Sequence, residues 1–348
     1  VSILGENRIF TYHGLQQINT CPSVAITYLM RLGKIQPGRV DMASIYYELG
    51  PRINAAGRMA HGAESVKLLI AEDHETAEEQ SQILDDYNRQ RQDLDQLVTR
   101  QAIELIEQEQ GLLQQPILIL YRPEWNKGVM GIVAARLADR YHRPVIILSR
   151  SGNFLAGSGR SSGGFDLYQA IQSCSDCLEN FGGHIFAAGL TIREDRLAEF
   201  RSRIETYATE AEHGPQRITP VLTIDAELRP SDISRALLRQ IELLYPFGTD
   251  NERPLFLVRG MRDAGGSRPV GKAQQHLSLR MTDSYQRIRP IHGFALGLAR
   301  YAPDITRHCA FALCFELEEN NFYPQSFLQL RVKDLCLESE LAERLEDK

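Results

Sequence analysis

Residues 116–160 read PILILYRPEWNKGVMGIVAARLADRYHRPVIILSRSGNFLAGSGR. Two short runs, 117–120 and 145–148, are continuously apolar, as expected for strands buried on both faces of a sheet. Between them, residues 129–141 carry apolar side chains at helical spacing, and a third strand-like run, 154–158, leads into glycine-rich sequence. This alternation of strand, helix and strand predicts an α/β domain.

A glycine-rich segment begins at the end of this stretch. Residues 157–166 read GSGRSSGGFD, in which the hydroxyls of Ser158 and Ser161 and the guanidinium of Arg160 stand among glycines. Backbone N–H groups, hydroxyls and an arginine fork are the groups that bind phosphate oxygens. We therefore expect a loop that wraps an anion. The alternative is a flexible hairpin loop with an exposed arginine.

A second glycine-rich segment, residues 181–190, reads FGGHIFAAGL and carries one titratable side chain, His184. Gly182 and Gly183 adopt positive φ without strain and leave room for a ligand beside the backbone. A histidine in this setting suits phosphate binding, metal ligation or acid–base chemistry. We interpret these three residues as part of a site. The alternative is a histidine that caps a following helix.

A third candidate lies near the N-terminus, where residues 50–58 read GPRINAAGR. Arg52, Asn54 and Arg58 share a turn rich in glycine and alanine. Two guanidinium groups and an amide would hold a phosphodiester backbone. The alternative is a helix-packing turn whose arginines are solvated.

Residues 63–109 are rich in Glu, Gln, Asp, Arg and Leu, with a break at Asp73 and His74. The spacing predicts a short helix followed by a long one with a thin apolar stripe. A long helix that is polar on most sides is typical of a connection between two domains. The stripe consists of Ile83, Tyr87, Leu94, Leu97, Ile103 and Ile106.

From about residue 215 the pattern changes to short strand-like runs separated by Gly, Asn and Asp, which predicts a small β-barrel. A helix is expected at 231–244, with Ser231 and Asp232 as caps. The expected strands are 221–225, 255–258, 276–280, 288–294, 309–317 and 326–332.

In the strand-rich part of the predicted barrel, basic residues outnumber acidic ones, and aromatic residues are interleaved with them. Such a face would follow a single-stranded backbone and stack bases; the alternative is an ordinary solvated surface. The basic residues are Arg259, Arg262, Arg268, Lys272, Arg280, Arg287, Arg289, Arg300, Arg331 and Lys333. The interleaved residues are Phe256, His276, Tyr285 and Phe294.

The chain has 348 residues and a formal net charge of -6, so two or three domains are expected and nucleic acid must be bound by local basic clusters. Six scattered cysteines predict reduced structural thiols in a cytoplasmic protein; Cys174 and Cys177 have metal-like spacing, but no second pair completes four ligands. No apolar run reaches membrane-spanning length, and neither a Walker loop nor a serine elbow is visible.

Taken in order, these motifs resemble the RecJ family of single-stranded-DNA-specific exonucleases, in the DHH phosphoesterase superfamily. The resemblance covers nearly the whole chain, and the joint order of its motifs is specific. The matching segments are residues 5–8, 50–58, 128–137, 157–161, 164–167, 181–190 and 328–334.

The resemblance implies an α/β fold in which residues 1–62 are the tail of the DHH catalytic domain. Residues 63–111 are the long connecting helix, 112–212 the DHH-associated substrate-binding domain, and 213–348 an OB-fold-like nucleic-acid-binding domain. The family binds two divalent metals, manganese or magnesium, through residues that lie upstream of the segment at 5–8. We therefore expect no metal ligand in this chain, and an isolated chain that is inactive or nearly so.

The resemblance also assigns roles to individual residues. It implies that Arg52, Arg58, Ser158 and Arg160 recognise the DNA 5′ end and its phosphates, and that His184 lines the active-site cleft. Asn54, Ser161, Gly182 and Gly183 complete the expected phosphate-binding set. Two departures weaken this transfer: Asn126 stands where the family usually has histidine, and Asp250 stands where it has glycine at a position that suits positive φ.

The resulting expectation is part of a 5′-to-3′ exonuclease that hydrolyses single-stranded DNA in repair and recombination. Single-stranded DNA, a single-strand-binding protein and a recombination helicase are the implied partners. No membrane partner is expected. The alternatives are a non-catalytic single-stranded nucleic-acid-binding module and a small-substrate DHH phosphodiesterase.

Overall fold

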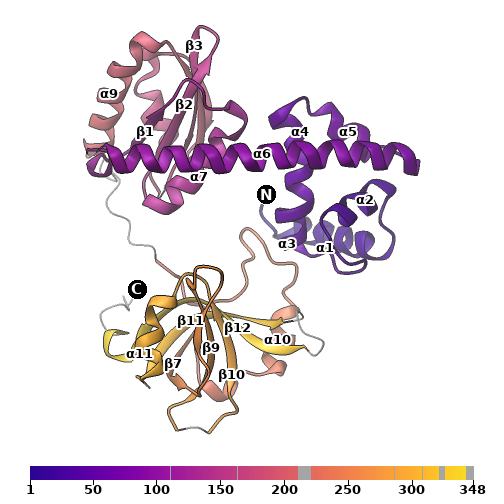
Figure 1. Ribbon diagram of the computed structural model, residues 1–348. Helices are drawn as coiled ribbons and strands as arrows, with labels where there is room; N and C mark the ends of the chain where they lie inside the picture. The colour runs from indigo at the N-terminus through magenta and orange to yellow at the C-terminus, as the bar shows by residue number, and fades with distance from the viewer. Residues whose placement is uncertain are drawn as a thin grey trace. The chain divides into compact units, whose positions relative to one another are not determined.

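The computed structural model describes residues 1–109, 111–162, 164–210, 221–285, 287–307, 309–320 and 326–341 (Figure 1). The chain forms two compact units. One contains residues 15–220, and the other combines residues 1–14 with 221–348. Residues 1–14 group with the second unit because the backbone N–H of Ile3 and the side chain of Arg8 donate to carbonyls of residues 243–249. The expected boundary at 212/213 lies outside the described residues.

The unit of residues 15–220 begins with a layer of helices on one long helix, α6 (His74–Gln108). Figure 1 shows α6 running from α5 at one end to α7 and the sheet at the other. Asp73 caps α6, accepting a hydrogen bond from the N–H of Thr76 at 2.7 Å, which explains the predicted break. The other elements are α1 (Gly5–Thr20), which crosses the unit boundary, α2 (Val24–Leu32), α3 (Met42–Ser44), the π-helix η1 (Ile45–Leu49), α4 (Gly50–Met59) and α5 (Ala63–Leu69).

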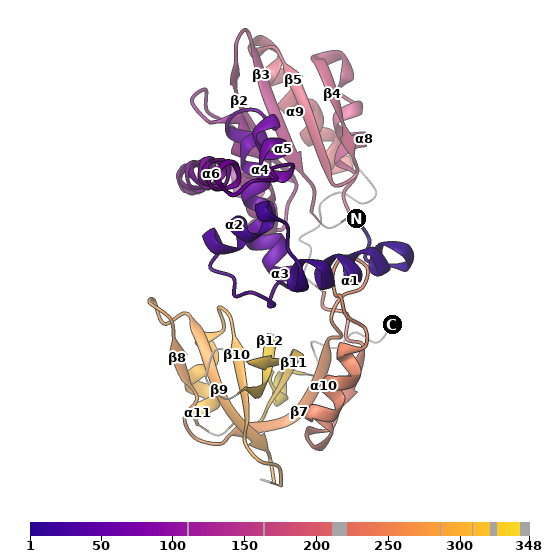
Figure 2. The ribbon, with the colours of Figure 1, turned by 90° about the vertical axis from the view of Figure 1, so that its right-hand side faces the viewer.

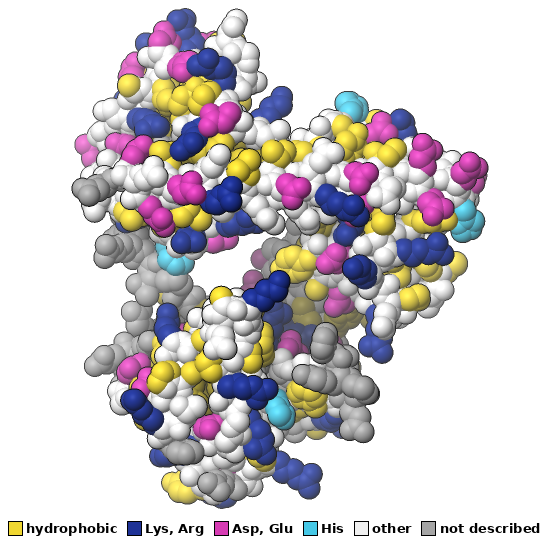
Figure 3. Space-filling model, viewed as in Figure 1, with side chains coloured by type: hydrophobic (Ala, Val, Ile, Leu, Met, Phe, Trp, Pro, Cys, Tyr) yellow, Lys and Arg dark blue, Asp and Glu magenta, His cyan; other side chains and the backbone are white. Residues whose placement is uncertain are grey.

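The buried face of α6 differs from the predicted apolar stripe. Leu97 is 39% exposed, whereas Asp85, Asn88 and Asp95 are buried. Polar residues occupy the inner face because they pair with arginines of the neighbouring helices. Acidic and basic side chains lie interspersed over the outer face of α6 (Figure 3).

The second part of this unit is a five-stranded sheet of order β1-β2-β3-β5-β4. Its first pair is parallel and the others are antiparallel. Figure 2 shows β2, β3, β5 and β4 side by side in this order. The elements are η2 (Leu112–Gln114), β1 (Leu118–Tyr121), α7 (Lys127–Tyr141), β2 (Val145–Ser151), β3 (Phe154–Arg160), α8 (Leu167–Gln172), η3 (Ser175–Cys177), β4 (Leu178–His184), β5 (Ala187–Ile192), η4 (Glu194–Arg196) and α9 (Leu197–Glu210).

Each face of the sheet is covered by different helices. On one face, Leu118, Val145 and Ile147 pack against α7 and α6. On the other, Ile146 and Leu190 pack against α8 and α9. Alternate side chains of one strand therefore enter two cores, as the continuously apolar runs predict. The predicted α/β fold is confirmed.

The structure corrects two details of the glycine-rich segments. Residues 157–160 are part of β3, not a loop, so their backbone N–H groups belong to the ladders with β2 and β5. His184 ends β4 and precedes a two-residue turn into β5, so no helix follows it. The expectation that residues 157–160 form a loop is therefore wrong, and so is the alternative of a helix cap at His184.

The unit that holds residues 221–341 is a barrel-like sheet. Its strand order is β6-β7-β11-β12-β10-β9-β8, and a further pairing of β7 with β9 over Met261–Asp263 joins five strands into a ring. This ring, with β10 parallel to β12, has the topology of an OB-fold. The elements are β6 (Ala226–Leu228), η5 (Pro230–Asp232), α10 (Arg235–Glu242), β7 (Phe256–Asp263), β8 (Arg268–Val270), β9 (His276–Asp283), β10 (Ile291–Ala295), η6 (Ala299–Tyr301), α11 (Ala302–Thr306), β11 (Phe311–Asn320), β12 (Phe327–Leu337) and η7 (Glu338–Glu340).

Two elements of this unit differ from the sequence prediction. Residues 221–225 form no strand, and β6 begins after them. The helix starts only at α10, where Ser234 is the cap instead of Ser231 or Asp232. Asp250 adopts φ 64°, so this aspartate does take the left-handed conformation that glycine would favour. None of the described helices has both the length and the apolar character needed to cross a bilayer.

Candidate phosphate-binding site

Strand β3 presents Ser158 and Arg160 on the sheet face that α7 partly covers. Side chains alternate along a strand, so Gly157 and Gly159 face the opposite core. A Cβ atom at Gly157 would lie 2.8 Å from Leu190, and one at Gly159 would lie 2.8 Å from Leu167. These two glycines are therefore packing residues, and Ser158 and Arg160 lie on the opposite face of the sheet.

Two cross-strand rows extend this face to the edge of the sheet. Arg160 is paired with Ala187, which is paired with His184. Residues opposite each other on antiparallel strands share a face, so the backbones of Arg160 and His184 stand roughly 10 Å apart with only an alanine between them. This places a guanidinium and an imidazole on either side of a shallow surface. We call this surface the floor; it consists of Ala187 in this row and of Gly189 and Gly182 in the next.

The second row supports the same floor. Ser158 is paired with Gly189, which is paired with Gly182, so no side chain fills the space beside the hydroxyl. Gly182 and Gly189 are exposed. Gly183 has φ 151°, and a Cβ there would lie 2.2 Å from the carbonyl oxygen of Ala187, so the turn requires glycine.

Arg160 keeps most of its donors for a ligand. Its Nη1 donates to Ser158 Oγ at 3.3 Å and to the carbonyl of Gly159 at 2.7 Å, and the other nitrogens donate to none of the described residues. Burial lowers the pKa of Arg160, and the neighbouring guanidinium of Arg58 lowers it further. Two arginines within electrostatic reach of each other are the kind of donors that bind an anion.

Helix α7 fixes the position of both arginines through two glycines. A Cβ at Gly128 would lie 2.3 Å from the carbonyl oxygen of Arg58, and the carbonyl of Gly128 accepts a hydrogen bond from Arg58 Nη1 at 3.1 Å. A Cβ at Gly131 would lie 2.7 Å from Arg160 Nη2 and 3.0 Å from Ser158 Oγ. The start of α7 therefore packs this closely against both arginines because Gly128 and Gly131 carry no side chains.

Asn126 and Trp125 at the start of α7 have structural roles. The Asn126 side chain accepts a hydrogen bond from the N–H of Gly128 at 2.8 Å and caps the helix. Trp125 is buried, and its Nε1 donates to Gln101 at 2.9 Å.

Arg52 does not belong to this site, which corrects its predicted role. Its guanidinium donates to Asp85 at 2.8 Å, to the carbonyl and carboxylate of Glu48 at 2.8 and 3.0 Å, and to the carbonyl of Leu32 at 3.2 Å. Only 12% of the side chain is exposed. Every nitrogen already has a protein acceptor, so Arg52 joins α4 to α2 and α6 and has no donor directed at a ligand.

Two further predicted residues, Ser161 and His184, lie beside the floor and differ in their roles. Ser161 Oγ donates to the carbonyl of Phe165, and its N–H donates to the carbonyl of Phe186 at 2.9 Å, so Ser161 shapes the turns beside the site and does not face the floor. His184 is exposed, and its Nδ1 accepts a hydrogen bond from the N–H of Phe186 at 3.3 Å. This bond leaves Nε2 of the neutral ring as the atom that carries the proton.

Asn54 and Arg58 line a pocket of about 420 Å³ beside the floor. Arg91 of α6 lines it as well. Arg91 was not among the predicted site residues, because a single arginine in a charged helix forms no motif with its neighbours in sequence. The pattern that reveals it is a polar stripe at helical spacing, formed by Asp85, Asn88, Arg91 and Asp95.

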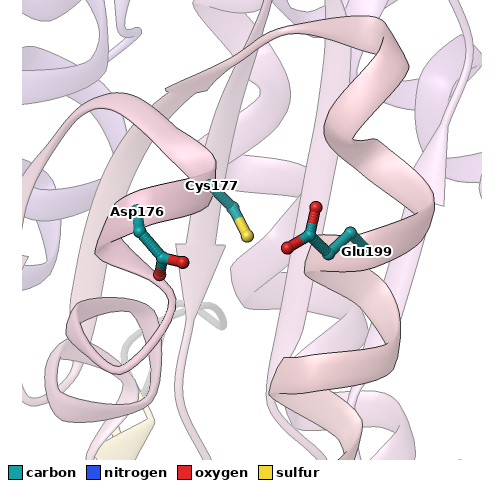
Figure 4. Close-up of side chains that lie close together, drawn as sticks. All are labelled: Asp176, Cys177 and Glu199. Atoms are coloured by element: carbon teal, nitrogen blue, oxygen red, sulfur yellow. The ribbon is translucent and has the colours of Figure 1, made fainter.

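A divalent metal is implied by the family resemblance, and one group among the described residues has a ligand-like arrangement. Asp176, Cys177 and Glu199 point toward one another, with ligand atoms within 4.8 Å (Figure 4). Arg203 Nη1 lies 2.5 Å from Asp176 Oδ2, 3.4 Å from Cys177 Sγ and 3.7 Å from Glu199 Oε1. Its hydrogen bond lowers the pKa of Asp176. A thiol and a resident guanidinium do not fit a magnesium or manganese pair.

The barrel unit carries a second candidate surface on β9, β10 and β12. His292 lies between Arg280 and Gln329, and Phe294 lies between Ser278 and Arg331. These residues share the outer face of strands that bind oligonucleotides in OB-folds. The structure removes Phe256 from the predicted face, because this ring is buried against Phe315 in the barrel core.

Comparison with known proteins identifies both parts of the chain. A family model described as the DHHA1 domain matches residues 114–210, and one described as the RecJ OB domain matches residues 224–334. The single-stranded-DNA-specific exonuclease RecJ of Bacillus subtilis is 30% identical over 341 residues, which cover 97% of this chain and 42% of the relative. The Haemophilus influenzae protein of the same name is 29% identical, over 94% of this chain and 58% of the relative.

A solved structure agrees with these sequence relatives. The crystal structure of RecJ from Thermus thermophilus in complex with Mg²⁺ superposes with a TM-score of 0.79 at 25% identity, covering 100% of this chain and 50% of that one. The chain thus spans about half the length of the curated relatives it matches. With a DHHA1 domain, a RecJ OB domain and these relatives along nearly its whole length, the chain belongs to the RecJ family of the DHH superfamily.

Proposed function

We propose that this chain supplies the DNA-binding part of a RecJ-type exonuclease, which hydrolyses phosphodiester bonds of single-stranded DNA from the 5′ end in repair and recombination. The observation that carries the proposal is the convergence of Arg58 and Arg160 on the two sides of α7, beside Ser158 and a floor of alanine and glycine. Relatives named single-stranded-DNA-specific exonucleases support the substrate class.

In this proposal the two arginines and Ser158 bind the non-bridging oxygens of one DNA phosphate. Arg160 offers a planar fork, and partial burial strengthens each charge-assisted hydrogen bond that it makes. The Ser158 hydroxyl, which accepts a hydrogen bond from Arg160, turns its own proton toward the same oxygen. The small residues of the floor allow the sugar–phosphate chain to lie directly on the sheet.

His184 closes the far side of the floor. Because Nδ1 accepts the N–H of Phe186, Nε2 is the donor that faces the bound strand. Gly182 and Gly183 leave its approach open. The proposed role is to position a phosphate oxygen at the edge of the sheet, opposite the arginines.

The metals of the reaction belong to residues other than those described here. The relatives of known structure are named as complexes with Mg²⁺ or Mn²⁺. Such ions would activate water and neutralise the charge that develops on the phosphate. Since the group around Arg203 does not fit them, we propose that this chain, purified alone, binds single strands and does not cleave them.

The barrel surface defined by Arg280, His292, Phe294 and Arg331 would bind a second stretch of the strand. Stacking on a ring tolerates any base, and arginines follow the backbone. A non-catalytic module for single strands would use the same two surfaces, and the RecJ OB match supports strand binding under either function. The partner proteins implied by the resemblance, a single-strand-binding protein and a recombination helicase, remain part of this proposal.

A binding assay on Arg160→Ala tests the proposed function. Fluorescence anisotropy with a labelled oligothymidylate should show roughly tenfold weaker binding. The salt slope, which is the slope of the logarithm of the binding constant against the logarithm of the salt concentration, should be smaller in magnitude by about 0.7, the value for one phosphate contact on a single strand. Arg193→Ala is the matched control, because Arg193 is 59% exposed and pairs only with the nearby Asp195 among the described carboxylates. Equal affinity and slope for Arg160→Ala and the wild type would contradict the proposal.

A further inference from the structure

A pocket of about 420 Å³ lies beside the phosphate-binding floor and has its own chemistry. The elements that line it are η1, α4, α6 and α7. Its polar side chains are Arg58, Asn54 and Arg91, and Tyr46 and Ile132 supply apolar surface. Two cations, an amide and a phenol ring on the wall of one pocket are the groups that would bind a nucleotide.

Arg91 has a buried hydrogen-bond donor that none of the described residues satisfies. Its Nε is buried and has no hydrogen-bond partner among the described residues. Asp95, the acid that raises the pKa of Arg91, is already bonded to Arg136 at 2.8 Å and to Thr99 at 3.4 Å. A buried donor without an acceptor destabilises a protein unless something supplies one.

The charges around Arg91 favour an anion as that acceptor. Burial lowers its pKa, Asp95 raises it, and the guanidinium groups of Arg58 and Arg136 lower it again. Arg58 has the same effect on Arg160, so it lies within electrostatic reach of both arginines. Positive charge thus continues from the sheet floor into the pocket through Arg58.

Tyr46 is held at the pocket by an irregular helix. Residues Ile45–Leu49 form a π-helix, a rare conformation that often accompanies functional sites. Gly50 follows it, and a Cβ there would lie 2.8 Å from the carbonyl oxygen of Ile45. Tyr46 is 48% exposed, so its ring keeps a free face at the pocket wall.

We propose that this pocket is a second nucleotide subsite, in which Arg91 and Arg58 bind a backbone phosphate and Tyr46 contacts the attached base. The inference rests on the proposed function, because it places the nucleotide next to the one bound by Ser158 and Arg160 along the same strand. Arg58 is shared between the two phosphates. Asn54, at the same wall, reaches the sugar or the base edge.

The experiment compares Arg91→Gln and Tyr46→Ala with the wild type in binding a 5′-phosphorylated, labelled oligothymidylate. Arg91→Gln should bind roughly tenfold more weakly, with a salt slope smaller by about 0.7. Tyr46→Ala should lose about fivefold or more, and Tyr46→Phe should retain the wild-type affinity because stacking needs only the ring. Arg100→Gln is the matched control, since Arg100 lies on the same helix and is 70% exposed.

A linkage scan then locates the subsite on the strand. Neutral methylphosphonate is placed at one linkage at a time, and the loss caused by Arg91→Gln should vanish at a single linkage. The loss caused by Arg160→Ala should vanish at a different one. The Tyr46→Ala loss should vanish when the base beside the Arg91 linkage is removed.

The outcomes separate this inference from the proposed function. If Arg160→Ala weakens binding but Arg91→Gln does not, the second subsite is wrong and the proposed function stands. If neither variant weakens binding, the proposed function fails. A single linkage common to both arginines would also overturn the second subsite. Thermal unfolding verifies that each variant is folded, and Arg91→Lys, which keeps the charge but loses Nε, should bind with intermediate affinity if Arg91→Gln does not fold.

Discussion

Gly131→Ala should separate stability from DNA binding in one substitution. The added Cβ would lie 2.7 Å from Arg160 Nη2 and 3.0 Å from Ser158 Oγ, whereas ordinary contact begins at 3.4 Å. The guanidinium must therefore move by about 0.7 Å, which is easy for the end of a flexible side chain. Gly131 lies inside α7, where alanine stabilises a helix by about 0.5–1 kcal/mol relative to glycine.

The predicted result is a protein at least as stable as the wild type that binds DNA more weakly. A displaced Arg160 loses much of a charge-assisted hydrogen bond, which contributes about 1.5–3 kcal/mol when intact. We expect a loss of about 1–2 kcal/mol, or roughly 5- to 30-fold in dissociation constant. Thermal unfolding and anisotropy titration with a labelled oligothymidylate measure the two quantities on the same sample.

Gly14→Ala is the control for this substitution. Gly14 lies inside α1, and a Cβ there would meet no atom within 4 Å. Both variants gain helix propensity, but only Gly131→Ala crowds the site. A Gly131→Ala protein that is folded and binds DNA as tightly as Gly14→Ala would refute the reasoning.

Three further predictions concern packing and charge. Gly128→Ala places a Cβ 2.3 Å from a backbone oxygen, so the free energy of unfolding should fall by about 1–3 kcal/mol, as urea denaturation would show; unchanged stability would contradict the contact. Arg52→Ala leaves the buried Asp85 with one arginine fewer and should lower the free energy of unfolding by about 2–4 kcal/mol in the same assay. The salt dependence of DNA binding by the folded protein should stay at the wild-type value. A weaker salt dependence would show that Arg52 binds a DNA phosphate. Burial raises the pKa of Glu318 above its usual 4.5, so its carboxyl group contributes stability below pH 4.5 that is lost as pH rises through the folded pKa. Glu318→Gln should therefore raise the melting temperature at neutral pH and not at acidic pH. Equal melting temperatures of the variant and the wild type at pH 7 would contradict this.

The strands and the long helix could be predicted because their signals are local. Runs such as 117–120 and 145–148 need no partner to be recognised as buried strands, and Asp73 caps α6 within one turn. The glycines of 157–160 were misleading for a physical reason. Glycine usually indicates a loop, but here it makes room for Leu190 and Leu167, which are distant in sequence.

Some site residues could likewise be predicted from local sequence, whereas others depend on partners that are distant in sequence. Ser158, Arg160 and His184 carry local chemistry that a sequence displays, and the structure places them on one face of the sheet. The structural role of Arg52 could not be predicted, because its buried partner Asp85 comes 33 positions later and the pairing depends on how α4 packs on α6. Arg91 was not predicted, because its place in a polar stripe of α6 points to a site only once the pocket beside it is known.

In the proposed function, Arg58 and Arg160 bind the same DNA phosphate across α7. A double-mutant cycle with Arg58→Ala, Arg160→Ala and the double variant, titrated with a 5′-phosphorylated single strand, measures it most directly. We expect a coupling free energy of about 1 kcal/mol or more, because either loss weakens the other contact to the same anion. Losses that add to within about 0.3–0.5 kcal/mol would show that the two arginines act independently and do not share a phosphate.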